Sequence, residues 1–474
     1  MERILAQLVT FVVSIVLARI LIPEAYGIVA LAQVFINLAN VFVTVGLNAS
    51  LIQQDDIDAL DYSTALYTNL GLAVILYVIL FITAPVIANF YSMPLISPLL
   101  RVLGMRLIIG AYNSVQRAFV SRNLLFRKFF WSTLGGTLVS AIVGVLMAVK
   151  GFGAWAIVGQ YLTNSTIDTI VLAITVPWKP KLLFSVNRLK RMYSFGWKVL
   201  AATFLNTCYL EIRSMVIGRE YSSGDLAYYN QGRQFPQLFY TNLSSAVTSV
   251  MFPVLSKSKN EEWAFNRQLH RTIQVLTYLI FPLMAGLIMT ASPIVKIVLS
   301  EKWLPCVFFL KAYALSYAIL PVQTVAEQAL KAAGRSDLFL KLFFVEKGVG
   351  IALILITMRI SVDAIAVGMF AGAVFSTILH VLSLRHITDY RLKDFMVDIS
   401  QNLIVTLLMC SSVFLVGLTL NSTLIKLILQ VITGVVVYIT VSILIKNTSM
   451  FYIVEMINNK LHCNLLNKLL GRRE

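Results

Sequence analysis

The residues best suited to chemistry in this sequence are ionisable side chains that interrupt long apolar stretches. Arg213 and Glu211 lie in the middle of one stretch, and Arg233 lies in the next. If these stretches cross a membrane, a charge facing lipid is costly, so such residues usually face a polar interior and mark a binding site. Arginine offers a planar fork of donors and stays charged when partly desolvated, which suits an anionic group such as a phosphate. The predicted binding residues are Arg213, Arg233, Arg3, Arg106 and Glu211.

Carboxylates are fewer than arginines within the apolar stretches, and the main ones are Glu211, Glu327 and Glu346. Glu327 and Lys331 are four residues apart, which predicts a self-neutralising pair on one helix face. A proton-coupled exporter of cationic drugs would instead rely on buried acids. Four basic residues, two of them already named, have another interpretation, in which their long side chains reach the membrane surface. They are Arg3, Arg117, Lys331 and Lys341.

Catalytic and metal-binding patterns are weak in this sequence. Four cysteines are scattered without a CxxC pair, and none of the four histidines has a Cys or carboxylate at ligand or triad spacing. No Gly-rich phosphate loop is present. The outward-facing connections are short, which disfavours a membrane polymerase or glycosyltransferase. We therefore predict no catalytic residue, no metal site and no cofactor, and a protein that is not an enzyme.

The composition identifies the elements that position these charges. The chain has 474 residues, of which 58% are hydrophobic and 13% charged, with a net charge of +17. A soluble protein has about 25% charged residues, so this chain is predicted to be an all-α polytopic membrane protein. Its Lys and Arg residues lie between long apolar runs rather than on one polar face, which argues against a nucleic-acid partner.

About fourteen apolar stretches have the length of about 20 residues that a bilayer-crossing helix requires. The predicted spans cover residues 4–21, 26–52, 64–88, 99–120, 130–149, 152–176, 193–218, 226–255, 273–299, 306–332, 338–358, 362–384, 403–420 and 424–445.

The charges of the connections predict the orientation. Connections after even-numbered spans, and the tail, hold most of the Lys and Arg residues, so both termini are predicted to be cytoplasmic. Residues 53–63 are an exception because they are acidic and contain no Lys or Arg. The N-terminal apolar run does not resemble a cleavable signal peptide. Since the first span is barely long enough, we expect a native start upstream of Met1.

A weak internal repeat predicts two halves. Glu24 and Gln33 match Asp225 and Gln234 at a shift of 201 residues, each acid just after a Pro or Gly turn. Two parallel six-helix repeats are typical of secondary transporters, which bind substrate at the repeat interface. Chance similarity of two hydrophobic hairpins is the alternative. The predicted parts are an N-terminal lobe (1–176), a cytoplasmic amphipathic linker (177–195), a C-terminal lobe (196–386), a helix pair (400–446) and an amphipathic cytoplasmic tail (447–474).

The linker and the tail are predicted to lie on the inner leaflet. The linker combines apolar and basic residues, and its helix is expected to start after Ser185 as N-cap. The tail repeats an apolar residue every four positions, surrounded by basic side chains that would bind anionic lipid. These apolar positions are Ile453, Ile457, Leu461, Leu465 and Leu469.

Several motifs resemble a known family along nearly the whole chain. LARILIPEAYGIVALA (residues 17–32) and VGLNASLIQ (45–53) resemble the opening of bacterial polysaccharide transporters. FGWK (195–198), VIG (216–218), AYYNQ (227–231) and VTSVMFPVLS (247–256) resemble the second half of that family. Its members are the lipopolysaccharide, O-antigen and teichuronic acid flippases of the multidrug/oligosaccharidyl-lipid/polysaccharide exporter superfamily.

This resemblance implies a flippase in the bacterial cytoplasmic (inner) membrane that serves cell-surface polysaccharide synthesis. It would turn an undecaprenyl-diphosphate-linked oligosaccharide to the outer leaflet by alternating access between two lobes around a cationic cavity. The arginines would attract the diphosphate, and amides would meet the sugars. A polysaccharide polymerase and a chain-length regulator are the expected partners besides membrane lipids. The amides in question are Asn37, Asn40, Asn206 and Gln231.

One departure from the family and one alternative remain open. The family often has an Asp a few residues before the Ile-Gly of the seventh span, where this chain has Arg213, with Glu211 two residues earlier. A role for that carboxylate is therefore not carried over. The alternative function is a cation-coupled small-molecule (drug) exporter of the same superfamily.

Overall fold

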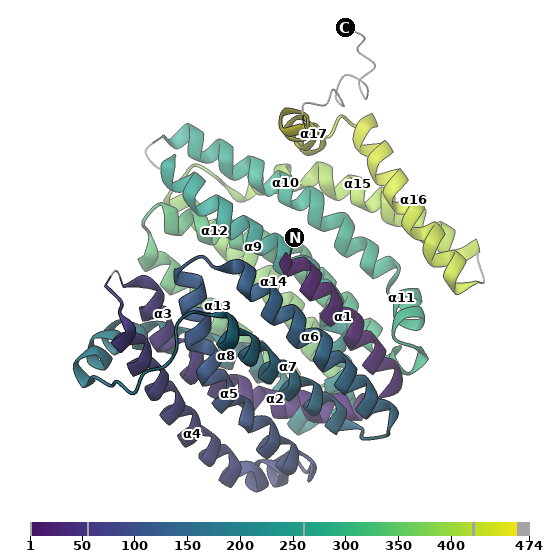
Figure 1. Cartoon of the computed structure of the whole chain (residues 1–474). Coiled ribbons are helices and arrows are strands. Elements are labelled where there is room, and N and C mark those ends of the chain that lie inside the picture. The colour runs from purple at the N-terminus through teal and green to yellow at the C-terminus, as the bar shows by residue number, and fades with distance from the viewer. Residues whose placement is uncertain (1, 55, 259–260, 420–421, 462–474) are drawn as a thin grey trace. The chain divides into compact units, whose positions relative to one another are not determined.

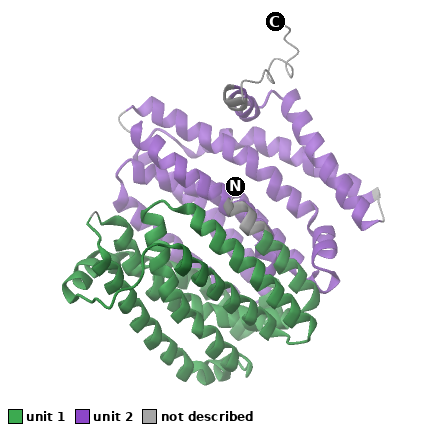
Figure 2. Ribbon diagram, viewed as in Figure 1, with its two compact units in different colours: residues 1–230 green, residues 231–474 purple. Residues whose placement is uncertain are grey.

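The computed structural model describes residues 2–54, 56–258, 261–419 and 422–461. Within these ranges all regular elements are helices, as predicted (Figure 1). The chain divides into two compact units, unit 1 (residues 1–230) and unit 2 (residues 231–474), shown in Figure 2. These units are defined by packing within each of them, so the lobe boundaries expected from the repeat stay a prediction.

Two helices of unit 1 begin at residues that favour a helix N-terminus. Pro23 starts its helix because the first turn needs no donor from its missing N–H. Asp58 caps another helix through a reciprocal capping box with Asp61. The helices of unit 1 are α1 (Glu2–Ile20), α2 (Pro23–Thr44), α3 (Gly46–Gln53), α4 (Ala59–Phe90), α5 (Ile96–Arg122), α6 (Phe126–Val149), α7 (Ala154–Thr175), α8 (Val186–Glu220) and the first residues of α9 (Ser223–Lys257).

Unit 2 contains the rest of α9 and the C-terminal helices. One of its buried cores joins α9, α10, α12, the end of α14 and the start of α15 around residues such as Leu269 and Tyr390. The further helices are α10 (Glu262–Met289), α11 (Ala291–Val298), α12 (Cys306–Ala332), α13 (Ser336–Thr357), α14 (Val362–Ser383), α15 (Leu392–Thr419), α16 (Thr423–Leu444) and α17 (Thr448–Leu461).

Nine helices of the described residues are long and apolar enough to cross a membrane, with α2 and α3 counted as one span. Five other long helices, α1, α5, α7, α8 and α13, coincide with the remaining predicted ranges. Charged residues inside α5, α8 and α13 lower their hydropathy. The fold is thus that of a multi-pass membrane protein, while the number of fourteen spans stays a prediction.

Helix α8 joins the predicted linker and the predicted seventh span without a break. It begins at Val186, and the Ser185 hydroxyl accepts a hydrogen bond from the Arg188 N–H at 3.4 Å, so the predicted N-cap is confirmed. Further along, α8 crosses α3 closely: a Cβ on Gly196 would lie 2.3 Å from the carbonyl oxygen of Gly46. Small residues permit such close backbone approach between membrane helices.

The two acids that the predicted repeat aligns occupy equivalent positions in their helices. Glu24 lies in the first turn of α2 and Asp225 in the first turn of α9. Within unit 1 the two corners touch, since a Cβ on Gly27 would lie 1.7 Å from the carbonyl oxygen of Ser223. Of the tail, residues 448–461 form α17, and the predicted apolar positions Leu465 and Leu469 lie outside the described residues.

Candidate functional site: polar networks within the helices

A polar network crosses from helix to helix in unit 1. Gln33 and Asn37 share one face of α2 because they are four residues apart, and Gln33 Nε2 donates to Asn37 Oδ1 at 2.7 Å. Asn37 Nδ2 in turn donates to Glu211 Oε1 of α8 at 2.8 Å. This network links two of the predicted residues, an amide and a carboxylate, that are 174 positions apart in the sequence.

Arg106 of α5 forms the other end of this network. Its Nη1 donates to Gln33 Oε1 at 2.8 Å, and its Nε donates to Ser165 Oγ of α7 at 3.1 Å. The guanidinium also lies 5.1 Å from the ring centroid of Tyr161. Among the described residues Arg106 has no carboxylate in ion-pair contact, and Glu211 is two amides away. We call Gln33, Asn37, Arg106, Ser165 and Glu211 the unit 1 network.

Within the unit 1 network the guanidinium of Arg106 contacts neutral groups, which solvate its charge but do not neutralise it. A guanidinium has five N–H donors, and two of its nitrogens bond here to an amide oxygen and a hydroxyl. A partly buried charge without a counter-ion favours an anionic ligand, because the ligand supplies both charge and acceptors. The network is therefore chemically suited to a phosphate group.

The other predicted residues lie in different places. Arg213 is on α8 with Glu211, but residues two apart point in different directions on a helix, and Arg213 Nη2 contacts the Tyr209 hydroxyl at 3.3 Å. Arg233 and Gln231 belong to unit 2, where Gln231 Oε1 accepts from Gln234 at 3.0 Å. Arg3 lies in α1, and its side chain is outside the described part of the structure.

A second charged contact in unit 1 involves an acid that the sequence reasoning missed. Arg117, for which a reach to the membrane surface stays a prediction, has its Nη2 at 2.7 Å from Asp168 Oδ2 of α7. Asn113, one helical turn earlier on α5, donates to the same oxygen at 2.9 Å. Asp168 is buried within a predicted apolar span. It is 51 positions from Arg117, so the sequence spacing does not indicate that the two residues pair. This pair ties α5 to α7.

Unit 2 contains a network of opposite character. Gln323 Nε2 of α12 donates to Glu327 Oε1 at 2.9 Å and to Glu346 Oε2 of α13 at 2.8 Å. Its own oxygen accepts from Ser376 Oγ of α14 at 2.9 Å. One buried amide thereby joins three helices. We call Gln323, Glu327, Glu346, Ser376 and His380 the unit 2 network.

Cations neutralise much of the unit 2 network. Lys347 Nζ lies 2.8 Å from Glu346 Oε1, and Lys331 Nζ lies 4.0 Å from Glu327 Oε2, which confirms the predicted pair at the limit of an ion-pair contact. His380 is buried, with Nε2 at 3.9 Å from Glu327 Oε1. Ligand atoms of Glu327, Glu346 and His380 lie within 4.8 Å of one another. This arrangement could hold a proton or a small cation.

Two histidines thus have carboxylate neighbours that their sequence spacing did not indicate. His380 approaches Glu327, and His270 Nδ1 lies 2.8 Å from Asp398 Oδ2. The partners are on other helices, 53 and 128 positions away. Sequence spacing detects partners on one helix face, and only tertiary packing brings such distant residues together.

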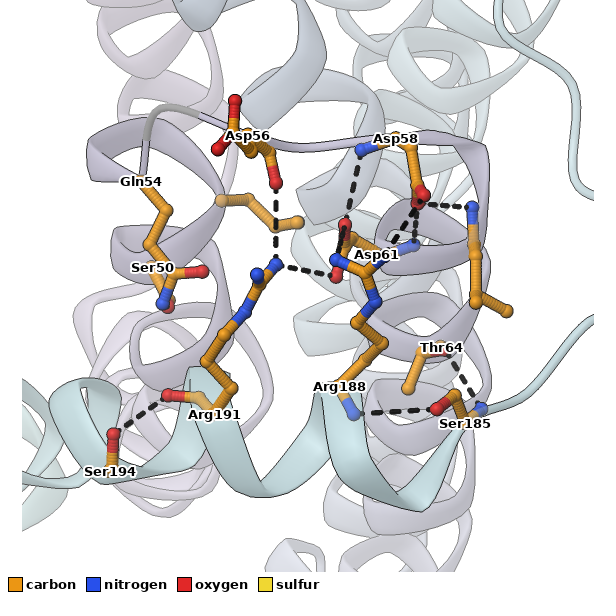
Figure 3. Close-up of polar contacts among 12 residues, drawn as sticks. Ser50, Gln54, Asp56, Asp58, Asp61, Thr64, Ser185, Arg188, Arg191 and Ser194 are labelled. Carbon is orange, nitrogen blue, oxygen red and sulfur yellow. Dashed lines mark hydrogen bonds and ion pairs between the residues drawn. The ribbon is translucent and has the colours of Figure 1, made fainter.

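The acidic connection after α3 faces the basic start of α8 (Figure 3). Asp61 is fully buried, and its carboxylate accepts from Arg191 at 3.1 Å and from Arg188 at 3.4 Å. Arg188 also lies 3.3 Å from Asp58. We call Asp58, Asp61, Arg188 and Arg191 the linker clamp.

The linker clamp accounts for the exception in the charge pattern. The acidic connection lies on the same side of unit 1 as the basic linker, and its charge is neutralised there. Hydrogen bonding to the backbone N–H of Asp61, helped by the side chain of Asp61 and the charge of Arg188, holds the pKa of Asp58 below its ordinary value. Asp58 therefore stays ionised at neutral pH, where it pairs with Arg188.

The helical fold and these networks define a multi-pass membrane protein with charged groups inside its helices. The sequence profile of the family described as polysaccharide biosynthesis protein matches residues 16–308, more than half of the chain. The chain belongs to this family, and the resemblance predicted from its hairpin motifs is confirmed.

Characterised relatives share moderate identity with this chain. The succinoglycan biosynthesis transport protein ExoT of Rhizobium meliloti is 26% identical over 69% of this chain and 66% of its own length. The teichuronic acid biosynthesis protein TuaB of Bacillus subtilis is 26% identical over 63% of this chain and 62% of its length. The lipopolysaccharide biosynthesis protein WzxC of Escherichia coli is 25% identical over 61% and 59%. The chain thus spans less than two thirds of these relatives.

Solved structures share the fold. The lipid II flippase MurJ in an inward closed conformation superimposes with a TM-score of 0.76 at 16% identity, covering 96% of this chain and 98% of MurJ. An inward-facing multidrug resistance transporter of the MATE family superimposes with a TM-score of 0.65 at 15% identity, covering 80% and 94%. At these identities the likeness concerns the fold alone.

Proposed function

We propose that the protein is a flippase that turns a polyprenyl-diphosphate-linked oligosaccharide from the cytoplasmic to the outer leaflet by alternating access. It serves cell-surface polysaccharide synthesis from the bacterial inner membrane, with both termini cytoplasmic, and it is not an enzyme. Membership of the polysaccharide biosynthesis family and the transport role in the name of ExoT support this proposal. A polysaccharide polymerase and a chain-length regulator are its proposed protein partners.

The observation that carries the proposal is the uncompensated charge of Arg106. Its guanidinium is held by an amide oxygen and a hydroxyl inside the helices of unit 1. A diphosphate supplies the missing negative charge and several acceptor oxygens for an arginine fork. Arg213, Arg233 and Arg3 are proposed to attract the same diphosphate, and Glu211 to set the orientation of Asn37. Sugar hydroxyls suit the neighbouring amides as hydrogen-bond partners.

The test is complementation of a bacterial strain that lacks its own copy of this gene. We expect lipid-linked glycan to accumulate on the cytoplasmic leaflet of that strain and to clear when the wild-type gene is restored. Replacing Arg213 and Arg233 together by Ala should abolish clearance while the protein is expressed normally. Full clearance by the double variant would refute their assignment, and absence of accumulation in the deletion strain would refute the function.

One observation favours the alternative, a cation-coupled exporter of small molecules. The unit 2 network gathers two carboxylates and a histidine, which is the chemistry expected for a cationic drug or a coupling cation. Purified protein in vesicles separates the two functions. Translocation of a cationic dye without translocation of lipid-linked glycan would favour the exporter, and glycan chain extension in the same vesicles would reveal an enzyme.

A further inference from the structure

A cavity of about 380 Å³ lies in unit 2 between α10 and α17. This volume is within the range of small-ligand pockets. The cavity contains none of the residues that we assign to transport. The polar and aromatic residues that line it are Arg267, His270, Arg271 and Gln274 of α10 and Thr448, Ser449 and Tyr452 of α17.

Two guanidinium groups give the cavity its charge. Arg267 and Arg271 are four residues apart, so they lie on one face of α10. Among the described residues neither is in ion-pair contact with a carboxylate. Arg271 lies over the ring of Tyr452 at 3.1 Å from its centroid, and Arg267 lies 5.1 Å from the ring of Trp263. Aromatic rings stabilise a cation without neutralising it, so the pair retains two positive charges.

A carboxylate behind the cavity wall, that of Asp398, is already occupied. Asp398 is buried, and it accepts hydrogen bonds of 2.8 Å from the Tyr390 hydroxyl and from Gln274 Nε2. His270 Nδ1 lies at 2.8 Å from the same carboxylate. Asp398 therefore holds His270 and Gln274 in place at the cavity wall and leaves His270 Nε2 as the nitrogen open to a ligand.

The cavity lies at the level where lipid headgroups are expected. The predicted apolar span of α10 starts near Ile273, directly after Arg271. Across the cavity α17 begins with Thr448 and Ser449, and Asn447 Oδ1 caps the N–H of Ser449 at 2.9 Å. Basic pockets between helices at the membrane surface bind anionic headgroups. Hydroxyls beside guanidinium groups complete a donor set for phosphate oxygens.

We propose that this cavity binds a phosphate ester and that the bound phosphate fastens α17 to α10. The two possible sources are the headgroup of an anionic phospholipid and a soluble phosphate. The guanidinium groups of Arg267 and Arg271 carry the affinity, and His270 and Ser449 add hydrogen bonds. This site is separate from the unit 1 network and does not depend on the transported substrate.

The test measures binding to the purified full-length protein in a neutral detergent. The probes are dioctanoyl phosphatidylglycerol, dioctanoyl phosphatidylcholine and inorganic phosphate, titrated while thermal unfolding is followed. We expect phosphatidylglycerol to raise the unfolding midpoint and phosphatidylcholine to leave it unchanged. A comparable rise with inorganic phosphate identifies a soluble source, and no rise with phosphate identifies the lipid. Both results support the site, whereas no rise with either probe overturns it.

Two variants and a matched control locate the binding. R267Q/R271Q should weaken phosphatidylglycerol binding at least tenfold. R385Q/K393Q removes the same charge from exposed residues of unit 2 that do not line the cavity, and it should bind like the wild type. Val275→Phe keeps both arginines but fills the cavity, so it should also lose binding, even if the double variant folds poorly. Equal weakening in the control, or unchanged binding in Val275→Phe, overturns the proposal.

Discussion

Each unit has a glutamine that bridges its polar network. The charge that this glutamine contacts is positive in unit 1 and negative in unit 2. In unit 1 the oxygen of Gln33 accepts from Arg106 and its nitrogen donates to Asn37. In unit 2 the nitrogen of Gln323 donates to two carboxylates and its oxygen accepts from Ser376. An amide has both donors and acceptors, so it can serve a cationic or an acidic network equally well.

The difference lies in how each charge is compensated. Lys347 and Lys331 lie beside the carboxylates of unit 2, whereas the described residues provide no carboxylate in contact with Arg106. The guanidinium of Arg106 is therefore open to an anionic ligand, whereas Glu327 and Glu346 each have a lysine in ion-pair contact. This contrast indicates that removing a charge affects transport most in unit 1, and that removing the bridging amide affects stability most in unit 2.

The largest expected effect comes from Arg106→Gln. Losing charge-assisted hydrogen bonds to a phosphate costs about 3 kcal/mol, which corresponds to roughly a 100-fold loss of transport. Arg106→Lys keeps the charge but not the planar fork, so it should retain part of the activity. The measurement is clearance of lipid-linked glycan from the cytoplasmic leaflet of the deletion strain.

The control for that change is on the same helix. Arg101 of α5 donates to the carbonyl oxygen of Phe81 at 3.2 Å and takes no part in the unit 1 network. Arg101→Gln should therefore clear glycan like the wild type. If Arg101→Gln and Arg106→Gln reduce clearance equally, the unit 1 network has no special role.

The next effect compares the two bridging glutamines. Gln323→Leu leaves two carboxylates and a hydroxyl without their donor or acceptor, which should lower the free energy of unfolding by about 2–3 kcal/mol. Gln33→Leu leaves only one guanidinium nitrogen and one amide without their hydrogen-bond partner, so it should lower the free energy of unfolding by less. Thermal unfolding of both purified variants tests this order. If Gln33→Leu lowered stability more than Gln323→Leu, the bridging amide would not matter most in unit 2, and the contrast between the units would be wrong.

A smaller effect is expected from the linker clamp of unit 1. A double-mutant cycle on Arg191 and Asp61 should give a coupling energy of about 1 kcal/mol, because Asp61 is fully buried while Arg191 is partly exposed. Unit 2 offers the matched control, Arg335 and Asp337, an exposed pair at 3.2 Å. Its coupling should be close to zero. Equal couplings would show that burial of the carboxylate is unimportant.

The smallest effect is a dependence on pH. The pKa of Asp58 is lower in the folded protein than its ordinary value, so the ionised form stabilises the folded state. This contribution is present above the ordinary pKa of an aspartate and is lost as the pH falls through the lowered pKa. Asp58→Asn should lack it. The difference in unfolding midpoint between wild type and Asp58→Asn should therefore shrink on acidification, and a growing difference would contradict the assignment.

Much of the fold was predictable from local patterns. The long helices coincide with the predicted spans, and Ser185 caps α8 as expected. The repeat placed Glu24 and Asp225 in equivalent first turns. These features depend on residues within a few turns of one another, where apolar run length and capping chemistry are sufficient.

The networks were predictable only in part. Arg106 and Glu211 were identified as single charges in apolar surroundings, but their connection through Gln33 and Asn37 was not. The pairing of Arg117 with Asp168 was not predicted either. No periodicity relates residues on different helices, so the sequence offers no measure of these contacts.

The sequence by itself determined that this protein crosses a membrane many times, where its helices run and which of its charges are costly. Hydrocarbon cannot satisfy backbone or charged groups, so an apolar run of sufficient length becomes a helix and an internal charge requires a partner. The tertiary structure decided which partners those are. It gave Arg106 an amide and a hydroxyl from two other helices and joined Gln323 to Glu346 and Ser376 on two others, because such contacts depend on the distance between helices, which local sequence does not encode.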